Sequence, residues 1–196
     1  MRPFSSFMLC FIIFFYTLIG DVLHAHGLGE ATLVKTWSGS KSIKSIANKV
    51  SKNKKLVSYK FSKNRCTSGY VQSSGKSKSN CYISMGFDNA FAATYSDDLI
   101  CTPAQEFYLP ALKKWIPACE LKVGDVLQSD SVGLVAITSI KLVAQPITVY
   151  SLEVDKHHNF FVGKYFILTH NMVLPWACSA GFSFSFGAGG GAAAGG

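Results

Sequence analysis

A histidine–asparagine pair, His170-Asn171, ends an apolar, strand-like run near the C-terminus of this 196-residue chain. The side-chain amide nitrogen of an asparagine can attack the asparagine's own backbone carbonyl, which forms a succinimide and cuts the chain after that residue. A neighbouring histidine can polarise that carbonyl or protonate the leaving amine. Asn171 and His170 are therefore candidate catalytic residues, and the cut would release residues 172–196.

Short β-strands, rather than long amphipathic helices, are expected to position these residues, because no long run of helical apolar periodicity occurs. Gly163-Lys164 separates two apolar runs, as the turn of a β-hairpin does. Residues 43–50 and 118–123 are predicted to form short helical turns. The predicted fold class is therefore all-β. Strands are expected over residues 32–36, 83–85, 90–95, 98–102, 107–109, 148–154, 160–162 and 165–168, with a hairpin-like pair over 132–143.

The N-terminal segment, residues 1–25, has the pattern of a signal peptide. Residues 4–20 follow a single basic residue, Arg2, and carry no charge; the run is short for a membrane span and suits the apolar core of a signal peptide. Cleavage after Ala25 would leave a chain that starts at His26, and an uncleaved N-terminal anchor is the alternative. We expect an exported protein, periplasmic, secreted or envelope-associated, that meets a membrane only through this segment.

One main domain is expected over residues 26–176, followed by a tail over 177–196. The tail is rich in Gly, Ala and Phe and carries no charge. Such low-complexity composition predicts a disordered or weakly associating segment rather than a packed element, and a terminal recognition signal is the alternative.

The stretch from Ala31 to Phe87 holds 12 Lys or Arg and no Asp or Glu, most densely over residues 51–80. One interpretation is a patch that binds a polyanion or an anionic envelope surface. The other is a solvated basic insertion between two β segments. No motif of a nucleic-acid-binding module occurs, so no specific nucleic-acid partner is expected.

The cysteines and histidines give no pattern of a metal site. None of the six cysteines has Cys-x-x-Cys spacing, which argues against zinc. A site built from His157, His158 and His170 would lack a clearly placed carboxylate or thiol. We therefore expect no metal and no cofactor. Cys66 and Cys81 could close a disulfide loop of roughly 15 residues, worth about 3 kcal/mol, although the sequence leaves the pairing open.

Several blocks in order resemble one family of autoprocessing domains. ATLVKT (31–36), followed by a glycine turn and KSIKSI (41–46), resembles the opening of a Hint (hedgehog/intein) domain of the bacterial polymorphic-toxin or pretoxin type. The later blocks are similar to LICTPAQEFY (99–108), WIPACELKVGDVL (115–127), VYSLEV (149–154), HNFFV (158–162) and the terminal His-Asn. The resemblance implies a compact, pseudo-twofold β fold with short helical turns that brings the start of the domain next to His170-Asn171. It also implies that His158 is the supporting histidine of the C-terminal cut and so a third candidate catalytic residue.

The family's Thr-x-x-His block, which polarises the first scissile bond, is matched by Thr102, but Gln105 stands at the histidine position. Gly27 falls at the position of the family's Cys or Ser nucleophile and offers no thiol or hydroxyl. Met172 follows Asn171 where splicing needs Cys, Ser or Thr. An amide has no useful basicity near neutral pH, so the chain is predicted to be splicing-incompetent, with N-terminal cleavage strongly disfavoured.

Two functions remain on this reasoning. The first is an exported autoprocessing protein whose substrate is its own polypeptide, cut at most once, after Asn171, so that no multiple-turnover enzyme is expected. The second is a catalytically inert Hint-like scaffold that acts as a basic, secreted, surface-binding or structural protein.

Overall fold

The computed structural model describes residues 26–49, 54–88 and 98–170, which form one 14-stranded, antiparallel sheet in the order β10-β11-β6-β7-β1-β12-β5-β4-β2-β13-β14-β8-β9, with β3 on β2. The strands are β1 (Leu28–Gly29), β2 (Leu33–Thr36), β3 (Gly39–Ser42), β4 (Lys55–Lys60), β5 (Arg65–Ser79), β6 (Tyr82–Asp88), β7 (Leu99–Cys101), β8 (Glu106–Leu109), β9 (Lys114–Pro117), β10 (Val126–Gln128), β11 (Leu134–Val143), β12 (Ile147–Val154), β13 (Asn159–Val162) and β14 (Ile167–His170). The predicted all-β class is confirmed.

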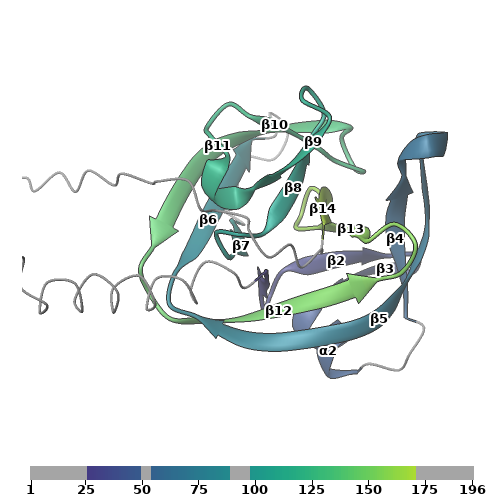
Figure 1. Cartoon of the computed structure of the whole chain (residues 1–196), viewed down its shortest axis with the longest axis horizontal. Helices are drawn as coiled ribbons and strands as arrows, with labels where there is room; N and C mark the ends of the chain where they lie inside the picture. The colour runs from purple at the N-terminus through teal and green to yellow at the C-terminus, as the bar shows by residue number, and fades with distance from the viewer. Residues whose placement is uncertain (1–25, 50–53, 89–97, 171–196) are drawn as a thin grey trace, which may run out of the picture.

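A long, bent, two-stranded ribbon is the frame of the sheet (Figure 1). β5 pairs with β12 along one arm, and β6 pairs with β11 along the other. Both connections lie at the same bend, because Ser79 is opposite Ile147 and Tyr82 is opposite Val143. The ribbon therefore changes direction over residues 80–81 and 144–146, which are outside the strands, and pairing continues on each side of them.

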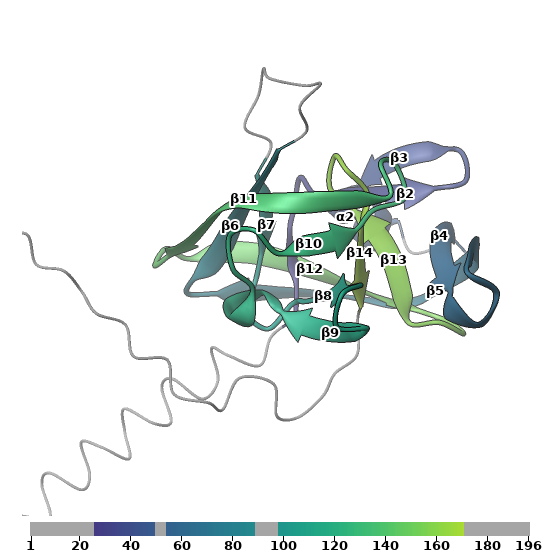
Figure 2. The same ribbon diagram turned by 90° about the horizontal axis from the view of Figure 1, so that it is seen from above.

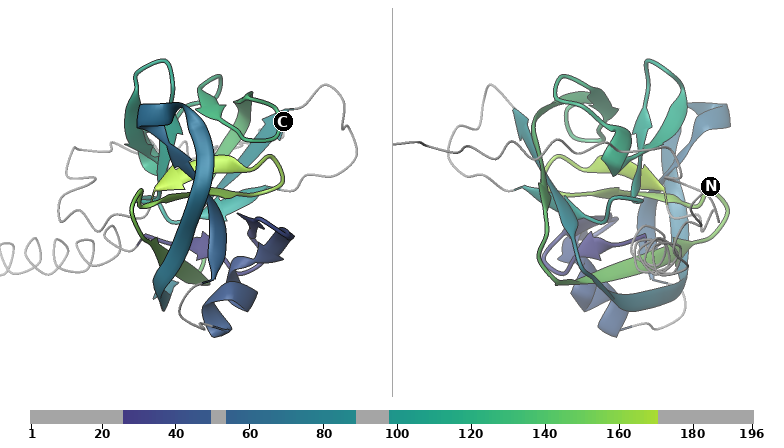
Figure 3. Two further views of the ribbon diagram at one scale, coloured as in Figure 1. Left: turned by 90° about the vertical axis from the view of Figure 1, so that its right-hand side faces the viewer. Right: turned by 60° about the vertical axis from the view of Figure 1, so that its left-hand side comes forward.

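The two ends of the sheet approach each other, so the sheet curls around its own core. β10, at one end of the strand order, contacts β8 and β14, and Ser129 just beyond it forms a bridge with Ile167 (Figure 2). The β4–β5 hairpin crosses in front of β13 and β14 at one side of the molecule (Figure 3, left). This curling places short strands that are distant in sequence within one small region.

Three short helical segments complete the described chain: α2 (Ile43–Asn48), η1 (Phe61–Lys63) and η2 (Ala118–Glu120). The Ser42 side chain caps α2 by accepting the Ser45 backbone N–H, and two isoleucines of the helix are buried. α2 and η2 confirm the two predicted helical turns, although each ends a few residues earlier than expected.

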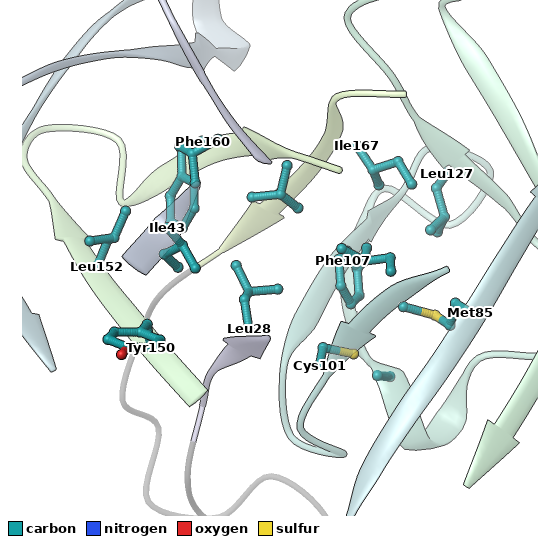
Figure 4. Close-up of a cluster of buried hydrophobic side chains, with 14 of the residues drawn as sticks. Leu28, Ile43, Met85, Cys101, Phe107, Leu127, Tyr150, Leu152, Phe160 and Ile167 are labelled. Carbon is teal, nitrogen blue, oxygen red and sulfur yellow. The ribbon is translucent and has the colours of Figure 1, made fainter. Parts of the chain in front are cut away.

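The core lies inside the curled sheet and contains side chains from most of the strands (Figure 4). Leu28 of β1, Cys101 of β7, Phe107 of β8 and Ile167 of β14 are among its buried members. Because successive strand residues face opposite sides, the neighbours of these core residues point away from the core centre. Three of them, Gly27, Thr102 and Glu106, belong to the candidate site.

Most of the described part of the stretch expected as a basic insertion, over 51–80, is strand. From residue 54 onward this stretch forms β4 and β5, which pair with each other and with β2 and β12. Leu56, Val57 and Val71 are buried, whereas the lysines between and beyond them are exposed or only partly buried. The segment is therefore a hairpin within the sheet. One face of the hairpin is apolar and buried, and the lysines lie at the solvent-facing positions.

Two smaller expectations also differ from the structure. Residues 134–143 form a single long strand, β11, whose irregularity between Ile137 and Ser139 is a register shift against β6 rather than a hairpin turn. Cys66 lies near the start of the 15-residue β5 and Cys81 beyond its end, and both thiols are unbridged. That separation far exceeds the ~4.4–6.8 Å between Cα atoms that a disulfide requires.

The predicted strand over 90–95, the signal segment 1–25 and the tail 177–196 lie outside the described residues. Within the described ranges, none of the helices has the length and apolar character needed to cross a membrane.

Candidate functional site

The turn from Thr102 to Gln105, between β7 and β8, connects the start of the domain to its last described strand. Both end residues of the turn are buried, at 0% and 2% exposure. The Gln105 backbone N–H donates to the Thr102 carbonyl across the turn at 3.1 Å. Backbone bonds from Ala118 and Cys119 to this turn hold it in place from η2.

Thr102 binds the residue at the expected nucleophile position. The Gly27 backbone N–H donates to Thr102 Oγ1 at 3.0 Å, and the Thr102 N–H donates to the Gly27 carbonyl at 2.9 Å. The Gly27 nitrogen belongs to the peptide bond that follows His26, which is the bond an N-terminal acyl shift would break. The threonine therefore contacts the peptide group at which the resemblance places the first cut, and its catalytic role stays a prediction.

Gln105 faces the other end of the domain. Its Nε2 donates to Thr169 Oγ1 at 2.7 Å and to the His170 backbone carbonyl at 2.8 Å, and Thr169 Oγ1 donates to the Glu106 carbonyl at 2.7 Å. The side chain thus supplies fixed hydrogen bonds to β14 and has no group that can carry a proton to the Gly27 nitrogen. One turn consequently joins the two ends that the resemblance predicted to be neighbours.

Gly27 has no room for a side chain. A Cβ at this position would lie 2.7 Å from Cγ2 and 2.8 Å from Cβ of Val149, a residue of β12 that is fully buried. These two atoms belong to a short, branched side chain that cannot swing away. Gly27 thus lacks a nucleophilic side chain, and Val149 occupies the space that such a side chain would need.

His170 is buried beside a carboxylate and an indole. Its Nδ1 lies 3.3 Å from Oε2 of Glu106, and both side chains are 8% exposed. Its imidazole ring lies 4.7 Å from the Trp115 ring, centroid to centroid, at an interplanar angle of 34°. His170 is directly opposite Glu106 in the β14–β8 ladder, so the strand register creates the pair.

The other candidate residues lie apart from this region or outside the described chain. His158 is exposed in the turn before β13, with a φ of 50°, and no contact of its side chain with His170 occurs among the described residues. Asn171 and Met172 lie outside the described residues. The structure brings together Gly27, Thr102, Gln105 and His170 through the shared turn, while the catalytic roles assigned from the sequence stay predictions.

Cys101 precedes Thr102 in the chain and is fully buried in the core. Burial strongly raises the pKa of its thiol, because the thiolate would lose its hydration. The thiol is therefore neutral at physiological pH and is a packing group rather than a nucleophile. Across residues 26–49, 54–88 and 98–170, no group of three His, Cys, Asp or Glu is placed to hold a metal ion.

Glu106 and Trp115 were missed as site residues by the sequence analysis. Glu106 follows Gln105 directly, and an ionisable residue next to the degenerate histidine position was a usable signal. Trp115 lies on β9, and its contact with His170 depends on the order β14-β8-β9, which sequence spacing alone does not reveal.

Comparisons with known proteins agree with this arrangement. The chain matches the family described as "Pretoxin HINT domain" over residues 33–172, more than half of its length. A bacterial intein-like domain from Clostridium thermocellum is 21% identical with a TM-score of 0.63, covering 75% of this chain and 98% of that domain. A DnaB intein from Synechocystis sp. PCC 6803 is 17% identical with a TM-score of 0.60, covering 76% of this chain and 100% of the intein.

The TvoVMA intein is a further similar structure, 19% identical with a TM-score of 0.62, covering 75% of this chain and 98% of the intein. No curated protein sequence matches the chain. At these identities the structural likeness shows a shared fold, and the family match adds the membership. The resemblance read from the sequence blocks is confirmed: the chain belongs to the pretoxin Hint domain family, and its fold is similar to that of inteins.

Proposed function

We propose that this pretoxin-type Hint domain is exported and that its remaining reaction is a single cut of its own chain after Asn171, by asparagine cyclisation without splicing. The observation that carries the proposal is the environment of His170. Its backbone carbonyl accepts a hydrogen bond from Gln105, and its buried ring lies between Glu106 and Trp115. A histidine held this firmly next to an asparagine suits general acid–base catalysis.

The same geometry argues against the earlier steps of the family's reaction. Gly27 has no nucleophile, and Val149 occupies the space of one. Gln105 holds β14 and has no proton to give to the bond after His26. Met172 has no hydroxyl or thiol to accept a transferred chain, so a released tail is the expected product.

The proposed step balances within the chain itself. Nδ2 of Asn171 attacks the Asn171 carbonyl carbon, and the bond to the Met172 nitrogen breaks. One hydrogen leaves Nδ2 and one reaches the Met172 nitrogen, so that the products are a C-terminal succinimide and a free amine. His170 is the group that moves this proton.

The full chain is expected to yield a product that ends at residue 171 and a fragment of residues 172–196, whereas Asn171→Ala abolishes both because alanine has no amide. Intact-mass analysis over time, at several pH values near neutrality, measures the cut. Asn48→Ala, at the exposed end of α2, is the matched control and should cleave like the parent. A parent chain whose mass never changes would contradict the proposal and favour the inert scaffold.

A second candidate function, binding to an anionic envelope surface, is favoured by a cluster of lysines on the sheet. A hollow of about 340 Å³ is lined by Thr36, Trp37, Ser38, Lys41, Lys54 and Lys55. Partial burial, followed by the like charges of Lys41 and Lys49, lowers the pKa of Lys54. An anion placed here would relieve that mutual repulsion, and the indole of Trp37 is half exposed beside it.

Replacing Lys41, Lys54 and Lys55 together with glutamine is expected to weaken binding to phosphatidylglycerol-containing vesicles about 100-fold, since each lysine near an anionic surface contributes about 1 kcal/mol. Vesicle co-sedimentation at rising salt measures the loss. The matched control replaces three exposed lysines elsewhere, Lys114, Lys122 and Lys141, and makes the same change in net charge. Equal weakening by the two triple variants would show net charge rather than a local site.

A further inference from the structure

The Nδ1 atom of His170 is buried without a hydrogen-bond partner among the described residues. A buried polar nitrogen in this state is rare, because it loses its hydration without compensation. The Glu106 carboxylate faces it at 3.3 Å. This distance is long for a hydrogen bond at rest, as catalytic contacts often are before the reacting groups close up.

Two groups lie where they can interact with an imidazolium that forms at His170 during the reaction. The Glu106 carboxylate attracts the imidazolium at Nδ1, and the Trp115 ring can stabilise a cation that lies over its face. The pair is nearly dry, at 8% exposure for each side chain, which strengthens the electrostatic interaction. Glu106 and Trp115 can therefore both interact with the His170 imidazolium during the cut.

We propose that Glu106 is the positioning residue of the asparagine cut: it holds the proton of neutral His170 on Nδ1 and stabilises the imidazolium that forms during the reaction. The proposal rests on the proposed cleavage after Asn171. We call the Glu106–His170 pair the relay; Glu106 acts on the cut only through the histidine. Gln105 and Glu106 have different roles: the Gln105 amide holds the backbone of His170, and the Glu106 carboxylate orients the His170 ring.

The relay accounts for each proton. With Nδ1 protonated and facing Glu106, Nε2 of His170 carries a lone pair and accepts the hydrogen that leaves Nδ2 of Asn171. The resulting imidazolium gives the same hydrogen to the Met172 nitrogen as the peptide bond breaks. Glu106 stays ionised throughout, as the carboxylate of a catalytic triad does, and the net change is the transfer of one hydrogen.

The sequence position of Glu106 and the strand register explain why this residue faces His170. Gln105 at the family's histidine position removes the usual titratable group from the middle block. Glu106 is the next residue, and the β8–β14 register places it opposite His170. The middle block thus still supplies one ionisable side chain. It is Glu106, one position after the family's histidine position, and it faces the histidine of the C-terminal cut.

Glu106→Leu is expected to slow the cut about 10–100-fold, by analogy with the loss of a group that orients a metal-ligating histidine. Glu106→Gln should retain more activity, because its side-chain carbonyl still accepts a hydrogen bond from Nδ1 while the negative charge is gone. Glu153→Gln, an exposed carboxylate on β12, is the matched control and should cleave at the parental rate.

A spectroscopic measurement tests the positioning itself. In full-length chain labelled with ¹⁵N and kept intact by Asn171→Ala, the His170 nitrogen shifts should report the Nδ1-protonated tautomer. Adding Glu106→Gln should keep that tautomer, and adding Glu106→Leu should shift the ring towards the Nε2-protonated form. The amide spectrum of each variant reports whether the fold is retained.

The outcomes are distinguishable. A parent chain that never cleaves overturns the self-cleavage and the relay together, whatever the tautomer of His170. A parent that cleaves, with a Glu106→Leu variant that is folded and unchanged in both tautomer and rate, overturns the relay alone. A slower cut together with a tautomer change in Glu106→Leu, and neither change in Glu153→Gln, supports it.

Discussion

Asn159→Leu is expected to lower the free energy of unfolding by about 3–5 kcal/mol, the range of mutations that break a buried polar network. The Asn159 amide is 1% exposed and uses all of its hydrogen-bonding capacity. Its Oδ1 accepts from Ser58 Oγ at 2.9 Å and from the Tyr59 N–H at 2.7 Å. Its Nδ2 donates to the carbonyls of Tyr59 and His157, each at 3.1 Å.

The size of this effect follows from the place of Asn159 in the sheet. β4 and β13 are separated by β2 in the strand order, and β2 pairs with each of them at a single position. The amide therefore bridges β4 to β13 where the sheet itself pairs weakly. Leucine has nearly the same volume but leaves the polar partners buried and unsatisfied, at about 1–3 kcal/mol for each group.

Urea unfolding of the full-length variants measures the change, with the slope compared to confirm a two-state transition. Asn159→Asp should also destabilise the protein, because a carboxylate would face two carbonyl oxygens with no hydrogen to donate. Asn48→Leu, exposed at the end of α2, should lie within about 0.5 kcal/mol of the parent. A loss below about 1 kcal/mol for Asn159→Leu would show that the bridge has no net value.

The fold class and the main blocks of the site could be predicted from sequence because their signals are local. Apolar runs, turn glycines and block order depend on neighbours along the chain. Gly163, with a φ of 74°, forms the turn between β13 and β14 as expected. A turn was expected between strands over 98–102 and 107–109, and the structure has it there with Gln105 in it, although Thr102 lies at the start of the turn rather than at the end of the strand.

The β4–β5 hairpin could not be predicted in this way. Its residues are mainly Lys, Ser and Gly, which have low β-propensity. Strand formation here depends on long-range pairing with β12 and on a few buried residues such as Leu56 and Val71. Long-range strand pairing thus outweighs the low β-propensity of the composition. A basic segment with the composition of a loop therefore forms two of the paired strands of the sheet.

The pairing of Glu106 with His170 is a second result that local signals could not provide. The two residues are far apart in sequence, and only the β8–β14 register makes them direct neighbours. A shift of one residue would turn the carboxylate to the other face of the sheet. A site residue of this kind can be identified only when the register of the paired strands is known.

The filled space at Gly27 changes what is expected from restoring the family's nucleophile. On the sequence alone, Gly27→Cys with Gln105→His should recover thiol-induced cleavage before residue 27. In the structure, the new Cβ would lie 2.7 Å from Val149 Cγ2. We therefore expect the pair of changes to fail unless Val149 is shortened as well.

Gly27→Cys alone should destabilise the protein by about 1–3 kcal/mol through overpacking. Val149→Ala alone should cost a similar amount through the cavity it leaves. Together they should cost less than the sum by about 1–3 kcal/mol, since the cysteine fills the space that the valine methyls leave. Urea unfolding of the four chains gives this coupling free energy without any reference to catalysis, and a coupling near zero would contradict the packing argument.

Catalysis is the second part of this prediction. With an extension in place of residues 1–25, the triple change Gly27→Cys, Val149→Ala and Gln105→His should release that extension when thiol is added. The cysteine gains room, Thr102 already holds the Gly27 nitrogen, and the histidine supplies a proton to it. The chain that retains Val149 should not cleave under the same conditions. If the triple variant folds, shows the packing coupling and still does not cleave, then space is not the barrier at this position, and the assignment of Gly27 to the nucleophile position has to be revised.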